Sequence, residues 1–234
     1  MGLMTNTLRK LGLYHPLRNI YWHLKYFGKD TKSVFTEIYH ENQWKGGESR
    51  SGQGSSLNQT KIIIESLPEI SNKLDVISIL DIPCGDFNWM SRVQLGHIKY
   101  TGGDIVPEVI KHNLENFGEK GRSFICINLI EDLLPNVDLV FCRDCLVHLP
   151  FKDIRSSINN IKRSGARYLM TTTFVNVQNN HDIAIGDFRP LNFERAPFNF
   201  PTPLLILNEG CTESNGVHLD KSLGIWKVFD LPDF

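Results

Sequence analysis

The hydrophobic positions of this 234-residue chain alternate between short apolar runs and longer segments with helical spacing. Helical spacing occupies about 57–72, 106–118 and 151–163, with a short helix near 88–93. Strands that alternate with helices predict an α/β fold, in which a mostly parallel sheet is covered by helices on both faces. The last two runs have no helix between them, so we expect an antiparallel end to the sheet. The runs that predict strands are 77–82, 98–103, 123–127, 137–142, 166–173, 203–210 and 222–231.

A Gly/Ser-rich stretch at 44–56 divides the chain. We therefore predict an N-terminal helical segment with a covering loop over 1–56 and an α/β domain over 57–234. Trp44, Glu48 and Arg50 are unusual in a mere spacer, and Ser55 or Ser56 can cap the helix that follows. Within the domain, residues 174–202 are rich in Asn, Pro and Phe and predict an irregular insertion. A loop of that length commonly forms a lid or binds an acceptor.

The composition is that of a soluble globular protein, with 41% hydrophobic and 22% charged residues. The formal net charge of −1 gives no general case for nucleic-acid binding. No apolar run approaches the ~20 residues that a membrane span needs, and the N-terminus lacks a signal-peptide pattern. The five cysteines lie mostly in apolar runs, which favours reduced thiols and a cytoplasmic location.

The first 29 residues are basic, with Arg9, Lys10, Arg18, Lys25 and Lys29 and no acid. A basic amphipathic segment either binds an anionic membrane or a partner, or packs as a helix on its own domain. The second explanation is the simpler one, and the sequence leaves both open. The apolar residues that recur at roughly helical spacing are Leu11, Leu13, Leu17, Ile20, Tyr21, Leu24 and Phe27, interrupted by Pro16.

The first predicted strand of the domain runs into the turn DIPCGDF at 81–87. A dinucleotide site would carry G-x-G-x-x-G, whose backbone amides bind a pyrophosphate. Here only Gly85 remains, Pro83 has no N–H, and Asp86 would repel a phosphate. The turn therefore favours a cofactor with positive charge and no phosphate. S-Adenosylmethionine, with its sulfonium and ammonium groups, has that form.

Polar residues also follow the next two strands. Asp104 comes 23 residues after Asp81, a spacing suited to a carboxylate that binds ribose hydroxyls. It also suits the cap of the following helix, and the two roles are compatible. Asn128, after the third strand, is placed either to contact an adenine edge or to form a turn.

The fourth strand ends in Arg143, followed by Asp144 and, four residues later, His148. A helical turn here would put Asp144 and His148 on one face, where the carboxylate can orient the imidazole as a general base. A buried structural histidine is the alternative. Cys142 and Cys145 form a C-x-x-C pair, but no second pair accompanies them, so we do not favour a metal or redox site.

These stretches resemble the class I S-adenosylmethionine-dependent methyltransferases. More narrowly, they are similar to a bacterial subgroup associated with capsule and lipopolysaccharide gene clusters. The resemblance covers about 33–232 and implies a Rossmann-like seven-stranded sheet whose last strand is antiparallel. The stretches that carry the resemblance to the class are ILDIPCGDFNWM, YTGGDIV, FICINLIEDLLPNVDLVFCRDCLVHLP and LGIWKVFDL. The resemblance to the subgroup rests on SVFTEIY, the later Trp44 and ESRSGQGS, followed by DIPCGDF and RDCLVHL.

The resemblance also implies a set of residues that bind the cofactor. Two of them depart from the family pattern: Pro83 stands for the first glycine of the loop and Asn128 for a commoner aspartate. The implied roles are the methionine end (Asp81, Pro83, Cys84, Gly85), the ribose (Asp104, Ile105), the adenine (Asn128, Leu129), closure from strand four (Arg143) and a cover from the N-terminal side (Trp44, Ser51, Gly52).

A sugar hydroxyl is a poor nucleophile, so O-methylation of a sugar would use His148, supported by Asp144, as base. The acceptor, a small molecule or sugar nucleotide, would contact Arg189, Asn192 and Arg195 of the insertion, and Asp86, Phe87 and Trp89 after the first strand. Mg²⁺ bound by Asp86, Asp144 and His148 is an alternative that we do not favour, because no dense carboxylate cluster accompanies them. Two other functions stay open: methylation of a carboxylate or amine, and a non-catalytic cofactor-binding or peripheral membrane subunit.

Overall fold

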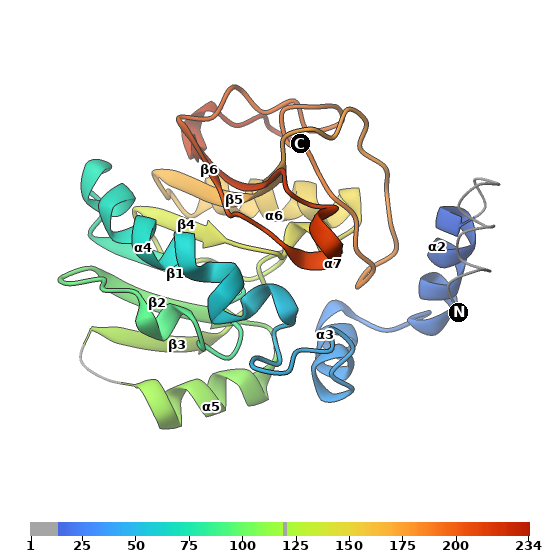
Figure 1. The fold of residues 1–234 in the computed structure, drawn as a ribbon, viewed down its shortest axis with the longest axis horizontal. Helices are drawn as coiled ribbons and strands as arrows, with labels where there is room; N and C mark the ends of the chain where they lie inside the picture. The colour runs from blue at the N-terminus through green and yellow to red at the C-terminus, as the bar shows by residue number, and fades with distance from the viewer. Residues whose placement is uncertain (1–13, 119–120) are drawn as a thin grey trace.

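The computed structural model describes residues 14–118 and 121–234, which are built around one seven-stranded sheet (Figure 1). The strand order is β3-β2-β1-β4-β5-β7-β6, and β7 runs antiparallel to both of its neighbours while the other pairs are parallel. This confirms the predicted fold class. The strands are β1 (Ser78–Asp81), β2 (Lys99–Asp104), β3 (Arg122–Cys126), β4 (Leu139–Cys142), β5 (Tyr168–Phe174), β6 (Leu205–Asn208) and β7 (Lys221–Lys227).

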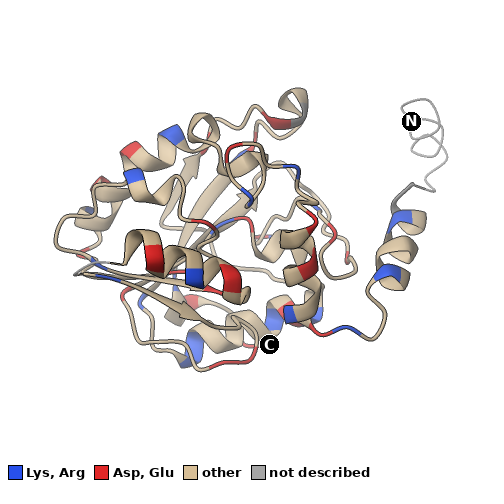
Figure 2. Ribbon diagram, turned by 90° about the horizontal axis from the view of Figure 1, so that it is seen from below, with Lys and Arg blue, Asp and Glu red and all other residues tan. Residues whose placement is uncertain are grey.

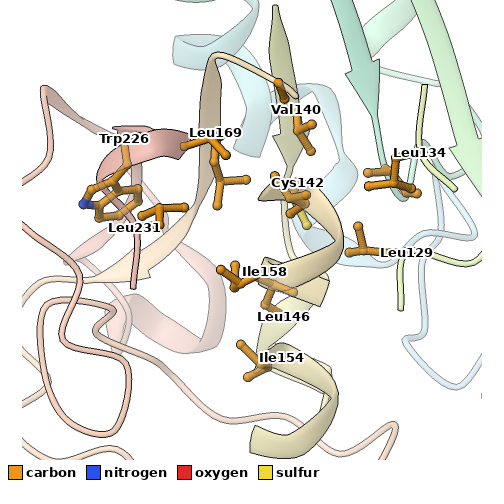
Figure 3. Packing of buried hydrophobic residues seen from close by; sticks show 14 of the residues in the cluster. Leu129, Leu134, Val140, Cys142, Leu146, Ile154, Ile158, Leu169, Trp226 and Leu231 are labelled. Atoms are coloured by element: carbon orange, nitrogen blue, oxygen red, sulfur yellow. The ribbon is translucent and has the colours of Figure 1, made fainter. Parts of the chain in front are cut away.

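The central strands of the sheet, such as β4 and β5, are buried on both faces, as in other parallel sheets. Side chains alternate along β4, so that Val140 and Cys142 pack with α6 (Phe151–Arg163), while Leu139 and Phe141 face the opposite core. Figure 3 shows the first core, in which Ile154 and Ile158 of α6 lie against the sheet. The second core contains residues of α4 (Leu57–Lys73) and α5 (Pro107–Phe117). Short elements η2 (Met90–Arg92), η3 (Leu146–His148), α7 (Glu213–Gly216) and η4 (Val228–Asp230) lie in the connections.

Two helices precede the sheet, α2 (Tyr14–Lys25) and α3 (Thr31–His40). Trp22 of α2 and Tyr26, which follows this helix, pack with Val34 and Ile38 of α3. Ile185 packs on the same cluster, so this part of the N-terminal segment lies against the insertion after β5. Figure 2 shows Lys and Arg on α2, which carries no Asp or Glu. Arg9, Lys10, Leu11 and Leu13, the other members of the basic amphipathic pattern, lie outside the described residues. No helix of the described part has the length and apolar character needed to cross a membrane.

The insertion after β5 has no regular element between Phe174 and Leu205. Three of its aromatic side chains, Phe193, Phe198 and Phe200, are buried in the same core as Trp226 of β7. Much of the segment is therefore packed on the domain. The 3-10 helix η1 (Gln53–Ser55) lies within the Gly/Ser-rich stretch.

Candidate functional site

A cavity of about 350 Å³ opens at the carboxyl ends of β1, β2 and β4. β1 lies between β2 and β4, so the chain reverses its direction across the sheet at this point, which is where open α/β sheets bind ligands. The structure brings all twelve residues that the sequence predicted for the cofactor to this one cavity. They are Trp44, Ser51, Gly52, Asp81, Pro83, Cys84, Gly85, Asp104, Ile105, Asn128, Leu129 and Arg143.

Two buried carboxylates face the cavity from the ends of adjacent strands. Asp81 accepts a hydrogen bond of 2.6 Å from the Tyr100 hydroxyl, and burial raises its pKa to about 7. Asp104 accepts hydrogen bonds from the backbone N–H groups of Gly85 (3.1 Å) and Val106 (3.0 Å), and burial raises its pKa to about 6. A cationic ligand would favour the ionised form of both groups, because its positive charge stabilises the carboxylates in place of the water that burial has removed.

The turn after β1 lies directly under the Gly/Ser-rich loop. Gly85 has a φ of +54°, and a Cβ atom there would lie 2.1 Å from the Ser51 Oγ. Asp86, predicted to contact the acceptor, holds this loop: its carboxylate accepts hydrogen bonds from the Ser49 hydroxyl (2.8 Å) and the Arg50 N–H (2.9 Å). Asp86 lines the cavity, and its side chain attaches the Gly/Ser-rich loop to the turn after β1.

Glu48 explains why the stretch at 44–56 is more than a spacer. Its carboxylate accepts hydrogen bonds from the Leu57 N–H (3.2 Å), the first residue of α4, and from the Asn88 side-chain amide (3.0 Å). The expected serine cap is not formed, because Ser56 occupies the cap position without a side-chain hydrogen bond. Glu48 therefore joins this loop to α4 and to the turn after β1.

Asn128 has one of the two roles that the sequence left open for its position, that of a turn residue. It lines the cavity beside Leu129, and its Oδ1 accepts a hydrogen bond of 2.9 Å from the Ile130 N–H, which closes a turn after β3. The turn is thus present, and the contact with adenine stays a prediction.

His148 lines the cavity, and one hydrogen bond defines the tautomer of its ring. Its Nδ1 lies 2.9 Å from the backbone oxygen of Asp187. A carbonyl oxygen only accepts hydrogen bonds, so Nδ1 carries the hydrogen and Nε2 keeps the lone pair. Burial lowers the pKa of the imidazole, and the rings of Trp44 and Phe188 lie 5.4 and 5.7 Å from it, centroid to centroid. The ring is therefore a neutral base among aromatic side chains.

Asp144 does not orient His148 by the hydrogen bond that the i, i+4 spacing predicted. Its carboxylate lies 2.6 Å from the Lys221 ammonium and 3.3 Å from the Arg143 guanidinium, which hold its pKa far below the usual range despite burial. Arg143 also donates to Glu209 at 2.7 Å. The chain is not regularly helical here, because Asp144 has a φ of +53°. Asp144 reaches His148 only through its charge, which raises the pKa of the ring.

Of the other residues predicted for the acceptor, Trp89 lines the cavity whereas Phe87, Arg189 and Asn192 do not. Phe87 is buried among core rings that include Tyr100, 5.1 Å away. Arg189 is also buried, and its guanidinium donates to the backbone oxygens of 146, 147 and 149. The amide of Asn192 donates to the backbone oxygens of 175 and 177. Arg189 and Asn192 thus hold the fold of the insertion.

The cavity also has a second end, built from residues that the sequence did not single out. His218 contacts the rings of Phe174 (5.4 Å) and Phe188 (5.5 Å), and Lys221 lies beside it at the start of β7. The Lys221 ammonium lies 3.5 Å from Glu209 and 3.7 Å from Glu213, in addition to Asp144. The only sequence feature that pointed to Lys221 was its position as a charged residue at the start of a mostly apolar strand. In the described part of the chain, no three His, Cys, Asp or Glu side chains are grouped so as to hold a metal ion.

No protein-family model and no curated protein matches this sequence. Solved structures do match its fold. A Burkholderia thailandensis 1,6-didemethyltoxoflavin-N1-methyltransferase with bound S-adenosylhomocysteine is 15% identical, with a TM-score of 0.59 over 84% of this chain and 86% of that one. A Clostridium acetobutylicum S-adenosylmethionine-dependent methyltransferase is 12% identical, with a TM-score of 0.53 over 85% and 99%. The [4+2]-cyclase SpnF is 17% identical, with a TM-score of 0.52 over 70% and 69%. The chain thus has the Rossmann-like fold of class I methyltransferases.

Proposed function

We propose that this protein transfers a methyl group from S-adenosylmethionine to a hydroxyl group of a sugar or similar polyol. The observation that carries the proposal is the arrangement of one cavity. Two desolvated carboxylates, Asp81 and Asp104, lie at one end, and the neutral His148 lies among aromatic rings at the other. The first pair suits a cationic nucleoside, and the second group suits an acceptor that must lose a proton.

The cofactor fits the first end residue by residue. Asp104 would accept hydrogen bonds from the ribose hydroxyls, because each of its oxygens has a lone pair left after its backbone contact. Asp81, Cys84 and Gly85 would surround the methionine part, where the Asp81 carboxylate offsets the ammonium and sulfonium charges. Asn128 and Leu129 would lie against the adenine.

The reaction would be an in-line displacement. The acceptor oxygen attacks the methyl carbon, the bond from carbon to sulfur breaks, and S-adenosylhomocysteine leaves. The hydroxyl proton passes to Nε2 of His148, the ring nitrogen that the Asp187 carbonyl leaves free. The protein contributes alignment of the two reactants and removal of that proton.

The second end of the cavity supports a hydroxylated acceptor without phosphate. Trp44, Phe174 and Phe188 offer ring faces to the C–H groups of a sugar, and carboxylates nearby accept hydrogen bonds from hydroxyls. Both Lys/Arg side chains on the cavity wall, Arg143 and Lys221, are already ion-paired. Arg189 is buried and bonded to backbone oxygens, so it does not offer a positive charge to the phosphates of a sugar nucleotide, as the sequence had suggested. Surface-polysaccharide synthesis remains the biological setting we favour.

A panel of acceptors with methyl-labelled S-adenosylmethionine tests this proposal. We expect label on neutral sugars, and a loss of ~10²-fold or more in the rate when His148 is changed to Ala. The second candidate, methylation of a carboxylate or amine, needs no strong base. Label on such acceptors, with a His148→Ala rate close to that of the original protein, would replace the sugar proposal with this one.

A further inference from the structure

Helix α2 is fastened to the segment that lies behind His148. The Arg18 guanidinium lies 2.5 Å from the Asp187 carboxylate, whose side chain is only 5% exposed. One residue further along α2, the Asn19 side-chain oxygen accepts a hydrogen bond of 2.6 Å from the Ala184 N–H. Consecutive residues of α2 thus hold both ends of the segment 184–187, which is more than 160 residues away in the sequence.

The same segment forms two hydrogen bonds with His148. The Gly186 N–H donates to the backbone oxygen of His148 at 2.9 Å, and the backbone oxygen of Asp187 accepts from the ring Nδ1. Arg189 adds contacts to the residue before His148, because its backbone N–H and its guanidinium both donate to the backbone oxygen of Val147. The orientation and tautomer of the imidazole therefore depend on where residues 186 and 187 lie.

From these contacts we propose that Arg18 is a positioning residue: through Asp187 it holds His148 with Nδ1 protonated and Nε2 free. The proposal rests on the proposed function only in giving His148 the role of base. Without Arg18, a carboxylate that is almost fully buried would lose the cation beside it, which is costly in a protein interior. Asp187 would turn toward solvent, and its carbonyl would move with it.

The charges around the ring lead to the same expectation. Asp144 faces His148 from the end of β4, Asp187 and Arg189 face it from the insertion, and Arg18 lies behind Asp187. Removal of Arg18 leaves the negative charge of Asp187 with only the more distant Arg189 to offset it, which favours the imidazolium. A ring that is protonated near neutral pH no longer accepts the proton of an acceptor. The basic N-terminal helix would thereby set the activity of the site.

The test is NMR of the full-length protein labelled with ¹⁵N-histidine, in which the His148 signal is assigned by its absence from a His148→Asn variant. We expect a neutral Nδ1–H ring in the original protein, titrating below the ordinary histidine range. Arg18→Ala should give a mixture of tautomers with a raised pKa, and Arg18→Lys should restore the original pattern. Lys25→Ala removes another cation of α2, one that pairs with Glu41, and should change nothing.

Asp187→Asn keeps the backbone carbonyl and removes the ion pair, so it checks the proposal if Arg18→Ala proves unstable. A His148 tautomer and pKa that stay unchanged in both variants would overturn the proposal. The measurement needs no substrate, so it is independent of whether the protein methylates sugars. If methyl transfer is found, Arg18→Ala should lower kcat by ~10- to 100-fold and leave the affinity for S-adenosylmethionine unaltered.

Discussion

The Asp86 carboxylate accepts a hydrogen bond from the Ser49 hydroxyl, 37 residues earlier in the chain, and so fastens the N-terminal loop over the turn after β1. The Arg50 N–H donates to the same carboxylate. In return, the Ser51 hydroxyl oxygen accepts from the Asp86 N–H at 3.2 Å. The loop and the turn are therefore one unit, and both line the cavity.

Asp86→Ala should loosen this unit. Because two of the four hydrogen bonds that connect the loop to the turn end on this carboxylate, we expect faster trypsin cleavage at Lys45 and Arg50 and weaker binding of S-adenosylmethionine, by about tenfold. Cleavage rates at these two sites check this. Equal rates with and without the carboxylate would show that the loop is held by other contacts.

Asp104→Asn should weaken cofactor binding by ~10- to 100-fold, because hydrogen bonds to a charged group contribute about 1.5–3 kcal/mol. Calorimetry with S-adenosylmethionine measures the change. Glu115→Gln is a suitable control, since this acid lies on the exposed face of α5. An unchanged affinity in Asp104→Asn would remove the ribose contact from the account.

The raised pKa of Asp81 predicts how stability depends on pH. Between an unfolded pKa near 3.8 and a folded pKa of about 7, the folded protein holds a proton that the unfolded chain has lost. The free energy of unfolding should therefore fall as the pH rises from 5 to 7.5 without cofactor. Asp81→Asn should show a smaller fall in urea unfolding over this range. Parallel curves for the two proteins would contradict the raised pKa.

Lys221→Met should lower the free energy of unfolding by about 3 kcal/mol, because it leaves Asp144 and Glu209 with less positive charge in a buried network. Lys227→Met, on an exposed side chain at the other end of β7, is the control and should change stability by about 0.5 kcal/mol or less. Urea unfolding compares them. Similar values for both variants would mean that the network adds little to stability.

The sheet could be predicted from the sequence because each strand is a short apolar run bounded by turn residues. All seven strands lie where predicted, with ends shifted by a few residues, and α6 spans Phe151–Arg163 as expected. The cofactor end of the cavity could also be predicted from the sequence, because the carboxyl ends of parallel strands meet at one edge of the sheet. Asp81, Asp104 and Asn128 each lie at or just after the end of a strand.

The acceptor end could not be predicted in the same way, because its contacts join residues far apart in sequence. The partner of His148 is the backbone oxygen of Asp187, 39 residues away, and a backbone atom leaves no signal in the residue type. Arg189 was predicted to contact the acceptor because it is a cation in a loop, yet its guanidinium donates four hydrogen bonds to backbone oxygens. Local spacing linked His148 to Asp144, whereas Lys221 from β7 holds that carboxylate.

Calorimetric titration with S-adenosylmethionine and, separately, with NAD⁺ tests the central claim most directly. The carboxylates Asp81, Asp86 and Asp104 around the turn favour a cationic cofactor and oppose a pyrophosphate. We predict that one S-adenosylmethionine binds per chain, that Asp104→Asn weakens it, and that NAD⁺ does not bind. Binding of NAD⁺, or no binding of S-adenosylmethionine, would contradict the account.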